Sequence, residues 1–495
     1  MNRPKETPRA AHERPACFEP LEGRLLLAGD VTAALSGGNL LIVGDDRAND
    51  IILDQDQLAA GQLRLSSGED ATGLNDGTDS LVFSGVTGNV VIRLGRGDDV
   101  VLVTGSALAG KLLVDGGGGS NTLTVDGTSI VSDLLFRGPA RGGGGTQTLA
   151  LLNASTVGGH VKVHHTRSDG VTIVDGATIG GSLHVRGHRG SETVDLLNST
   201  VGGHVKIFSG HGDAAVNVDA LDVGLDFFVQ GRHGDADVTL QELTARHVKV
   251  FNHKGNTSLL ADGLDVEGQL FIKNNHGRDD VSVQNSDVFG HLKIHNGQGD
   301  STTLLDNVVV EEGSLWVHAK KGVDTVSLLD ATVAGHVKIA TQHGGSDTTI
   351  DLSAIGGNLH VHAKKGADTV TVTGDTTIAG ETKIHTGQDD DLVVIDDVTA
   401  TGAVKIHTAQ GADTVAIEAN GLPDGPASGF GGKVRIDTGT DDDSITIGAA
   451  DEDGNTVVFD AAVLVNGGSG TDTLDWLGHG FETDGVVVVG VETIT

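Results

Sequence analysis

The sequence predicts an all-β fold, a right-handed parallel β-helix that forms a single elongated domain with about 22 residues per rung. Three observations favour this fold. A short strand motif recurs at spacings of 21 to 23 residues, apolar residues alternate with polar ones inside each copy, and turns rich in glycine separate the copies. A fixed period of this length is typical of one supersecondary unit that is stacked many times.

The first strand of each rung is the clearest element. It reads HVKV at 160–163 and HVKI at 204–207 and 336–339, with apolar residues at every second position. This period of two is the β signal. The residue at the centre of the strand is mostly a lysine on one rung and an aromatic residue or histidine on the next. These central residues are Lys162, His184, Lys206, Phe228, Lys249, Phe271, Lys293, Trp316, Lys338, His360, Lys383 and Lys405.

A second strand follows a turn of glycine and aspartate, and a short third segment completes the rung. The second strand reads DTVSLLD at 324–330 and DTVTVTG at 368–374, and the third segment reads STVGG at 199–203. Three short strands and three turns fit a three-sided rung whose aliphatic side chains point inside. Weaker copies in both directions bring the total to 17 or 18 rungs. At about 4.8 Å per rung, the rod is expected to be about 80–90 Å long.

The regularity of the repeat divides the chain into four parts. Residues 1–30 have no repeat and are interpreted as a targeting or leader segment, and residues 31–157 as irregular first rungs. Residues 158–418 hold the regular repeats, and residues 419–495 the last rungs and a C-terminal cap.

The chain is strongly acidic, with 33 Lys and Arg against 68 Asp and Glu and a net charge of −35. Such a surface disfavours nucleic acid and anionic lipid and attracts cations. Cys17 is the single cysteine, so no internal disulfide is expected. No apolar run approaches the roughly 18 residues that a membrane helix requires. We therefore expect neither a nucleic-acid partner nor a membrane span.

The alternating rows on the first strand have two interpretations. Lysines placed between aromatic rings avoid like-charge repulsion and gain cation–π contacts, so the rows could serve stability alone. Alternatively the rows form a binding strip, because partly exposed aromatic side chains stack on sugars or dock a partner. The candidate ligand patch consists of Phe208, Phe228, Phe251, Phe271 and Trp316.

The turn between the first and second strands resembles a calcium-binding repeat. Its clearest copy, GGSGTDTL at 467–474, is similar to the nonapeptide of RTX, hemolysin-type proteins. In that family, backbone carbonyls and the aspartates of adjacent turns hold Ca²⁺, so the resemblance implies calcium as a cofactor. The expected ligands are Asp98, Asp99, Asp389, Asp390, Asp391, Asp441, Asp442, Asp443 and Asp472.

This chain departs from the RTX pattern in two ways. Its coil turns in about 22 residues, whereas two RTX nonapeptides span about 18. In some copies the acidic residue is replaced by Asn121, Gln147, Ala214 or Ser301. Calcium binding and simple turn formation by aspartate both remain open at this point.

The N-terminal segment has its own resemblance. Residues 18–31 read FEPLEGRLLLAGDV, which is similar to the LEPR-XLL type of motif that begins planctomycete extracellular proteins with a repetitive β-rich body. The resemblance implies export to the cell surface or the medium. The motif supplies no catalytic residues.

These features favour an extracellular or cell-surface structural or adhesion protein without enzyme activity. Its expected partners are polysaccharide or surface and matrix proteins. The alternative is a carbohydrate-active β-helix enzyme of the polysaccharide lyase or glycoside hydrolase class. Such an enzyme needs a cleft where catalytic residues depart from the repeat, and the largest insertion here is the loop at 419–432. The sequence has no nucleophile motif, phosphate loop or HExxH motif.

Overall fold

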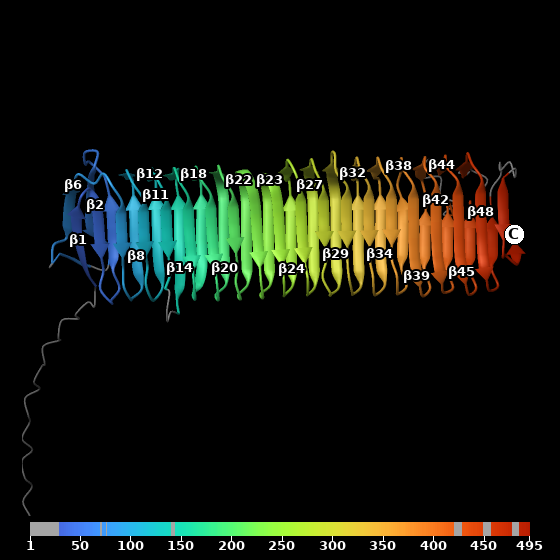
Figure 1. Cartoon of the computed structure of the whole chain (residues 1–495), viewed down its shortest axis with the longest axis horizontal. Coiled ribbons are helices and arrows are strands. Elements are labelled where there is room, and N and C mark those ends of the chain that lie inside the picture. Colours follow the sequence, from blue (N-terminus) through green and yellow to red (C-terminus); the bar gives the residue numbers. More distant parts are fainter. Residues whose placement is uncertain are drawn as a thin grey trace, which may run out of the picture.

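The computed structural model describes residues 29–495, except for 70–71, 76, 140–143, 420–427, 449–456 and 478–484. The regular elements of the described residues are 51 strands, β1 to β51, and none is a helix. They form a long rod in which the chain advances from one end to the other (Figure 1). Cys17 and most of the motif at 18–31 lie outside the described residues.

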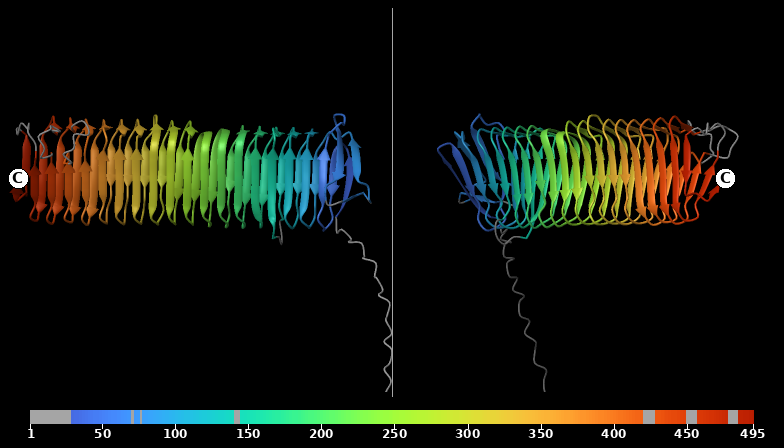
Figure 2. Two further views of the ribbon diagram at one scale, coloured as in Figure 1. Left: turned by 180° about the vertical axis from the view of Figure 1, so that it is seen from behind. Right: turned by 45° about the vertical axis from the view of Figure 1, so that its right-hand side comes forward.

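Each rung of the rod has three sides, which we name faces A, B and C in chain order. About 17 turns, about 22 residues apart, stack on one another in a parallel β-solenoid, as the repeat predicts. Figure 2 shows the same stacking from behind and from the side. The prediction of an all-β solenoid with a single elongated domain is therefore confirmed.

Face A is formed by the first strand of each rung. Its strands are β2 (Asn39–Val43), β7 (Val90–Arg93), β10 (Leu112–Asp115), β13 (Leu134–Arg137), β16 (Val161–His165), β19 (Leu183–Gly187), β21 (Val205–Phe208), β26 (Leu270–Asn274), β28 (Leu292–His295), β30 (Leu315–His318), β33 (Val337–Ala340), β36 (Leu359–His362), β39 (Thr382–Gln388), β42 (Val404–Gln410), β45 (Val434–Thr440), β48 (Val463–Ser469) and β50 (Val486–Val489).

Face B is formed by the second strand of each rung. Its strands are β3 (Asp50–Asp54), β8 (Asp99–Thr104), β11 (Asn121–Asp126), β14 (Thr146–Leu152), β17 (Asp169–Asp175), β20 (Glu192–Val201), β22 (Ala214–Gly231), β23 (Ala236–Asn252), β24 (Thr257–Asp262), β27 (Asp279–Val288), β29 (Ser301–Val310), β31 (Asp324–Leu329), β34 (Ser346–Asp351), β37 (Thr369–Thr373), β40 (Leu392–Ile395), β43 (Thr414–Ile417), β46 (Ser444–Ile447), β49 (Thr473–Trp476) and β51 (Thr493–Ile494).

Face C is short. Its strands are β9 (Ala107–Leu108), β12 (Ser129–Ile130), β15 (Thr156–Val157), β18 (Thr178–Ile179), β25 (Asp265–Val266), β32 (Thr332–Val333), β35 (Ala354–Ile355), β38 (Thr376–Ile378), β41 (Val398–Ala400), β44 (Gly429–Phe430) and β47 (Val458–Phe459). On some rungs the chain continues from face to face without a break in strand geometry. The last residues of β20, β27 and β29 belong to face C, and β22 and β23 run through faces B and C and end on face A.

The N-terminal end of the rod has a different pairing. β1 (Asp30–Ser36) pairs antiparallel with β2, and β4 (Gln62–Ser67) pairs antiparallel with β3 and with β6 (Ser80–Ser84). β5 (Gly73–Leu74) pairs with β1. The parallel stack begins where β2 and β3 meet β7 and β8. These antiparallel strands flank the first parallel rung and reduce its open edge, which would otherwise be available to another strand.

The interior consists of stacked aliphatic rows. On face A, Val337 and Ile339 of β33 pair with Leu359 and Val361 of β36, and all four side chains are buried. Such rows join into one core along the described length of the rod. A core built from rows of valine, leucine and isoleucine needs few aromatic side chains, which accounts for a chain with 12 Phe and no Tyr.

The turns between faces A and B carry glycine on most rungs at the position where rungs touch. Gly344 has a φ of 108°, and a Cβ on it would lie 2.0 Å from the carbonyl oxygen of Gly322, one rung away. A side chain at Gly344 would therefore meet both the backbone strain and the clash. Glycine recurs at this position on most rungs, whereas Asp389 and Asp441 adopt a positive φ at the equivalent positions of two later rungs.

Candidate functional site

The outward side chains at the centre of face A form one continuous row, which we name the central row. Strand register places Lys206 beside Phe228, Phe228 beside Lys249, and Lys249 beside Phe271. The same alternation continues through Lys293, Trp316, Lys338 and His360 to Lys383, after which Lys405 and Arg435 follow directly. The predicted alternation therefore lies along one surface of the rod.

A second row runs parallel to the central row, two residues further along each strand. It contains the following side chains in rung order: Arg137, His164, Arg186, Phe208, Gln230, Phe251, Lys273, His295, His318, Ala340, His362, His385, His407 and Asp437. His362, His385 and His407 stack face to face with ring centroids 4.9 Å apart. Face A thus presents two adjacent rows of basic and aromatic groups.

Four members of the predicted aromatic patch meet at the junction of the two rows. The ring centroids of Phe208 and Phe228 lie 5.4 Å apart, those of Phe228 and Phe251 5.5 Å, and those of Phe251 and Phe271 5.2 Å. Trp316 stands apart from these rings. It stacks on His291 with centroids 5.4 Å apart, and the Lys293 ammonium lies 4.1 Å from its ring centroid.

The cationic groups of the chain are segregated by face. In the described part of the chain, the strand segments that form faces B and C contain no lysine or arginine, whereas they contain many aspartates. The lysines and arginines of the parallel rungs lie on face A or in the turns that flank it. A rod with a formal charge of −35 therefore carries a cationic face.

The acidic groups on face A are largely neutralised by that same face. Asp226 pairs with Arg246 at 2.9 Å, and Asp437 pairs with Arg435 at 3.0 Å. Glu381 pairs with Lys405 at 2.5 Å and with Lys383 at 3.4 Å. The hydrogen bond from the Lys405 ammonium is the main cause of the lowered pKa of Glu381. None of the described ion pairs includes a lysine from this set of the central row: Lys162, Lys206, Lys249, Lys293 and Lys338.

Four histidines of the second row contribute little positive charge at neutral pH. Partial burial is the first cause that lowers the pKa of His295, His318, His362 and His385. Neighbouring lysines lower the pKa of the first three further, and neighbouring histidines lower that of His295, His362 and His385. A neutral imidazole both donates and accepts hydrogen bonds. The positive charge of face A therefore comes from its lysines and arginines.

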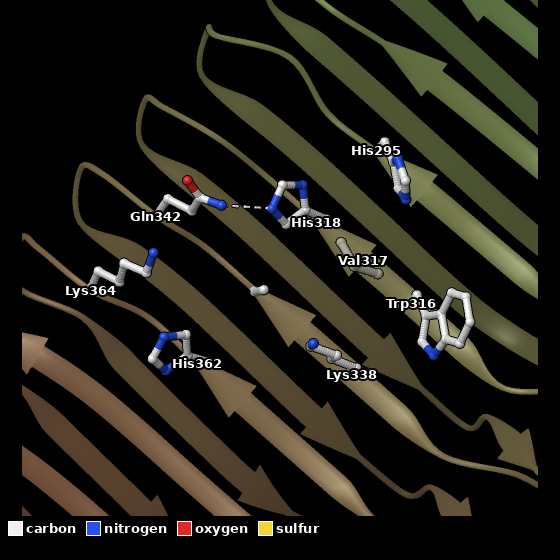
Figure 3. Close-up of a pocket in the computed structure, with 9 residues that line it drawn as sticks. His295, Trp316, Val317, His318, Lys338, Gln342, His362 and Lys364 are labelled. Atoms are coloured by element: carbon white, nitrogen blue, oxygen red, sulfur yellow. Dashed lines mark hydrogen bonds between the residues drawn. The ribbon is translucent and has the colours of Figure 1, made fainter.

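Besides a smaller hollow of about 250 Å³ beside the second-row residues Arg186, Phe208 and Gln230, two hollows open along the central row of face A. The first, of about 610 Å³, lies over the phenylalanine cluster and has Lys206 and Lys249 in its lining. The second, of about 590 Å³, is lined by Trp316, His318, Lys338 and Ala340, together with His295, Val317, Gln342, His362 and Lys364 (Figure 3). The hollows occupy consecutive stretches of the same rows, the first ending on the rung of Phe271 and the second beginning on the rung of His295.

Histidines at the corner before face A have a different role. The Nδ1 atoms of His160, His247, His291 and His336 each accept a backbone N–H from the next rung at 2.8–2.9 Å. On the rungs between, Ser182 and Ser314 accept the N–H of His204 and His336 through their hydroxyl oxygens. These side chains tie one rung to the next, which accounts for their recurrence on every second rung.

A row of buried acidic and polar side chains lies inside the turn between faces A and B; we name it the acid row. Strand register aligns Asp99, Asn121 and Gln147 near one end, and Asp279, Ser301, Asp324 and Ser346 in the middle. In the middle a serine hydroxyl separates the carboxylates, as where Ser301 donates to Asp324 at 2.6 Å. Glu192 holds the equivalent position on its rung and meets His165 at 2.8 Å, with both side chains fully buried.

Near the C-terminal end the acid row consists of five aspartates on successive rungs. The backbone N–H of Asp368 donates to Asp391, that of Asp391 to Asp413, that of Asp413 to Asp443 and that of Asp443 to Asp472, each at 2.9 Å. All five side chains are at most 3% exposed. The second carboxylate oxygen of each has no hydrogen bond of good geometry, although the hydroxyls of Thr386, Thr408 and Thr438 lie close enough to Asp391, Asp413 and Asp443 to act against the rise in pKa. No hydroxyl separates them.

The electrostatics of these five residues follow from their burial. Burial raises the pKa of Asp368, Asp391, Asp413 and Asp443 to about 6, with neighbouring aspartates of the row adding to the increase. Like charges one rung apart, about 4.8 Å, cannot all ionise in an interior without a compensating cation. These carboxyl groups are therefore either partly protonated or neutralised by a cation bound among them.

The nine aspartates predicted as calcium ligands fall into three groups. Asp99, Asp391, Asp443 and Asp472 belong to the acid row. Asp98, Asp390 and Asp442 lie outside, where each accepts a backbone N–H of the next rung at 2.7–2.9 Å. Asp389 and Asp441 adopt positive φ values of 80° and 83° and accept glycine N–H groups.

Sequence reasoning did not single out Asp368 and Asp413, which complete the C-terminal stretch of the acid row. Their signal is a single aspartate directly before the threonine that begins or precedes the second strand, as in DTV at 368–370 and 413–415. Within the described residues, no group of three or more His, Cys, Asp or Glu side chains is arranged to hold a metal ion. The same residues include no helix of the length and apolarity that crossing a bilayer requires.

No protein-family model, no curated protein and no solved structure matches this chain.

Proposed function

We propose that the protein is an extracellular or cell-surface structural rod that holds a component of its surroundings along face A, without catalysing a reaction. The observation that carries this proposal is the segregation of charge: an acidic rod presents its cations, together with a row of partly exposed aromatic groups, on one face of a regular scaffold. A stiff solenoid that repeats the same side chains on successive rungs suits the binding of an extended partner.

The two hollows of face A give weaker support to the alternative function, a carbohydrate-active enzyme. A glycoside hydrolase uses two carboxyl groups on either side of the bond that is cleaved. The two linings together include one carboxylate, Asp226, and its partners are Arg246 and His204. Lysines, aromatic rings and neutral histidines bind a ligand without supplying that pair of groups.

The proposal is tested by locating the protein and its attachment. Intact cells of the source organism should be labelled by an antibody against the rod, and the purified chain should co-sediment with a washed cell-envelope fraction. Replacing Lys249, Lys293 and Lys338 by Gln should strongly reduce co-sedimentation, and replacing Thr325, Thr349 and Thr371 of face B by Gln should leave it unchanged. A purely intracellular location, or equal co-sedimentation of both variants, would contradict the proposal.

We also propose that Ca²⁺ binds in the acid row between Asp368 and Asp472. Five buried carboxylates, each with one oxygen that has no hydrogen bond of good geometry, fit a hard cation, which prefers oxygen ligands. Asp391, Asp413 and Asp443, each with an acidic neighbour on both sides, are the residues expected to hold it. A bound cation supplies the positive charge that lets neighbouring carboxylates ionise together.

Thermal unfolding followed by circular dichroism tests the calcium proposal. At pH 7.5, Ca²⁺ should raise the unfolding midpoint over that measured in chelator, and Mg²⁺ should raise it less because it demands a stricter geometry. At pH 4.5 the calcium effect should shrink, because protons compete for the same oxygens. If Ca²⁺ does not change the unfolding midpoint at pH 7.5, the calcium proposal is wrong. The proposed binding role of face A is not affected by that result.

A further inference from the structure

We propose that face A binds an anionic polysaccharide, a glycan bearing carboxylate or sulfate groups, which lies along the rod and is anchored in the hollow at Ala340. This inference rests on the proposed function, because it names the ligand class of the same face. Four features of face A support this ligand: its charge, its aromatic groups, their shared spacing and the shape of the hollow.

Charge complementarity points to an anion. Lys249, Lys293 and Lys338 project from the central row, and none of them takes part in a described ion pair. The surrounding faces are acidic, so an anionic polymer is repelled from them and steered toward face A. A neutral glycan would leave these ammonium groups without a counter-charge.

Aromatic platforms point to a sugar. Between the lysines stand Phe228, Phe271 and Trp316, whose rings are partly exposed. Trp316 has 37% of its surface exposed. An apolar ring face beside a cation suits a sugar ring, which has an apolar face and polar edges.

The spacing of these groups favours a polysaccharide over a nucleic acid. One lysine and one aromatic ring recur every two rungs, which is about 9.6 Å and close to the length of an extended disaccharide. A glycan with one acidic group per disaccharide, or with one per sugar of which every second group meets a lysine, therefore stays in register with the row. Double-stranded DNA carries one charge per about 1.7 Å of its axis, so most of its phosphates would find no cation on this face.

The hollow at Ala340 provides an anchoring point. In the second row Ala340 stands between His318 and His362, so the imidazole that would continue the row is missing and a space of about 590 Å³ remains. Trp316 and Lys338 lie on one side of this space and Lys364 on another (Figure 3).

Polar groups of the hollow suit a sugar as well as an acid group. The Gln342 side-chain nitrogen lies 2.8 Å from His318 Nε2, which fixes the amide beside the space. His318 and His362 have lowered pKa values through burial first and neighbouring cations second, so they offer neutral donors and acceptors. Two ammonium groups, one aromatic ring and several neutral polar groups together form a subsite for one acidic sugar.

Binding of the purified full-length chain to defined polymers tests the inference. The probes are polygalacturonate, which carries carboxylates, dextran sulfate, which carries sulfates, uncharged dextran, and double-stranded DNA. We expect binding to at least one of the two acidic glycans that weakens with salt, no measurable binding to dextran, and weaker binding to DNA. Binding to one acidic glycan alone identifies carboxylate or sulfate as the recognised group.

Three variants locate the binding. The Lys249→Gln, Lys293→Gln, Lys338→Gln triple variant should lower affinity by about tenfold or more, because three partly exposed ion pairs are lost. The Lys254→Gln, Lys321→Gln, Lys433→Gln variant makes the same change of charge outside the two hollows and should bind as the wild type does. Ala340→His should fill the hollow and weaken binding while the unfolding midpoint is retained, because histidine already occupies the neighbouring positions.

The outcomes separate this inference from the proposed function. Equal affinity of both lysine variants, or tighter binding to DNA than to either acidic glycan, would overturn the polysaccharide assignment. If the chain co-sediments with cell envelope through its face A lysines yet binds neither acidic glycan, only the ligand class is wrong. If the chain binds neither the cell envelope nor either acidic glycan, both proposals are wrong. Shortening of the glycan during incubation would reveal an enzyme instead of a binding protein.

Discussion

At the scale of single residues, the properties of a side chain in this rod depend on its neighbours one rung away. Asp413 is buried between Asp391 and Asp443, and burial together with these neighbours raises its pKa to about 6. Asn121 occupies the equivalent position on an earlier rung, where its side-chain nitrogen donates to Gln147 at 3.1 Å and its oxygen accepts the N–H of Asp99. The fold therefore accepts an amide in this row.

Replacing Asp413 by Asn should stabilise the calcium-free protein at pH 7.5. Because the folded-state pKa of Asp413 lies above the 3.8 of an ordinary aspartate, the native state holds its proton more tightly than the unfolded chain does. The stability from this proton is complete below about pH 4 and is lost as the pH rises through about 6. Asparagine keeps the hydrogen-bond acceptor and cannot ionise.

The measurement is the unfolding midpoint of Asp413→Asn and wild type in chelator at pH 7.5 and pH 4.5. We expect a higher midpoint for the variant at pH 7.5 and a much smaller difference at pH 4.5. Asp442→Asn changes an exposed aspartate in the neighbouring turn and serves as the control for charge alone. A variant that is less stable than wild type at pH 7.5, with a smaller loss at pH 4.5, would show that the row needs its carboxylates ionised without calcium.

At the scale of elements, the sequence was sufficient to predict the rungs because each of them repeats the same three short strands. The central residues from Lys162 to Lys405 lie in one row, as their spacing predicts. The antiparallel pairing of β1 with β2 and of β4 with β6 was not predicted. A hairpin strand has the same alternation of apolar residues as a solenoid strand, so the pattern alone does not distinguish parallel from antiparallel neighbours.

Only part of each candidate site could be predicted from the sequence. The aromatic patch was identified by residue type, but the isolation of Trp316 from the four phenylalanines depends on strand register. Asp390 and Asp391 are adjacent in the chain, yet Asp391 points into the acid row while Asp390 accepts a hydrogen bond outside it. In a turn, alternation no longer assigns side chains to faces, and this is why Asp368 and Asp413 went unnoticed. The hollow at Ala340 arises because a small side chain interrupts a row of larger ones.

At the scale of the whole molecule, the rod combines a uniform scaffold with two different rows. The acid row lies inside the turn and links rung to rung, so its charge state governs stability. The rows of face A lie outside and carry the cations of an otherwise acidic particle. Because face A is built from successive rungs, its binding groups recur at a fixed interval along the rod. This arrangement fits an extended polymer better than a compact ligand.

The central claim is that a polymer lies along face A, and lysine labelling in the presence of polygalacturonate or dextran sulfate tests it most directly. Each lysine of the purified chain is acetylated under limiting conditions with and without the polymer, and its modification is measured by mass spectrometry. We expect protection of Lys249, Lys293 and Lys338, with Lys254, Lys321 and Lys433 reacting as they do without polymer. Equal protection of both groups, or no protection of the first group, would contradict the claim.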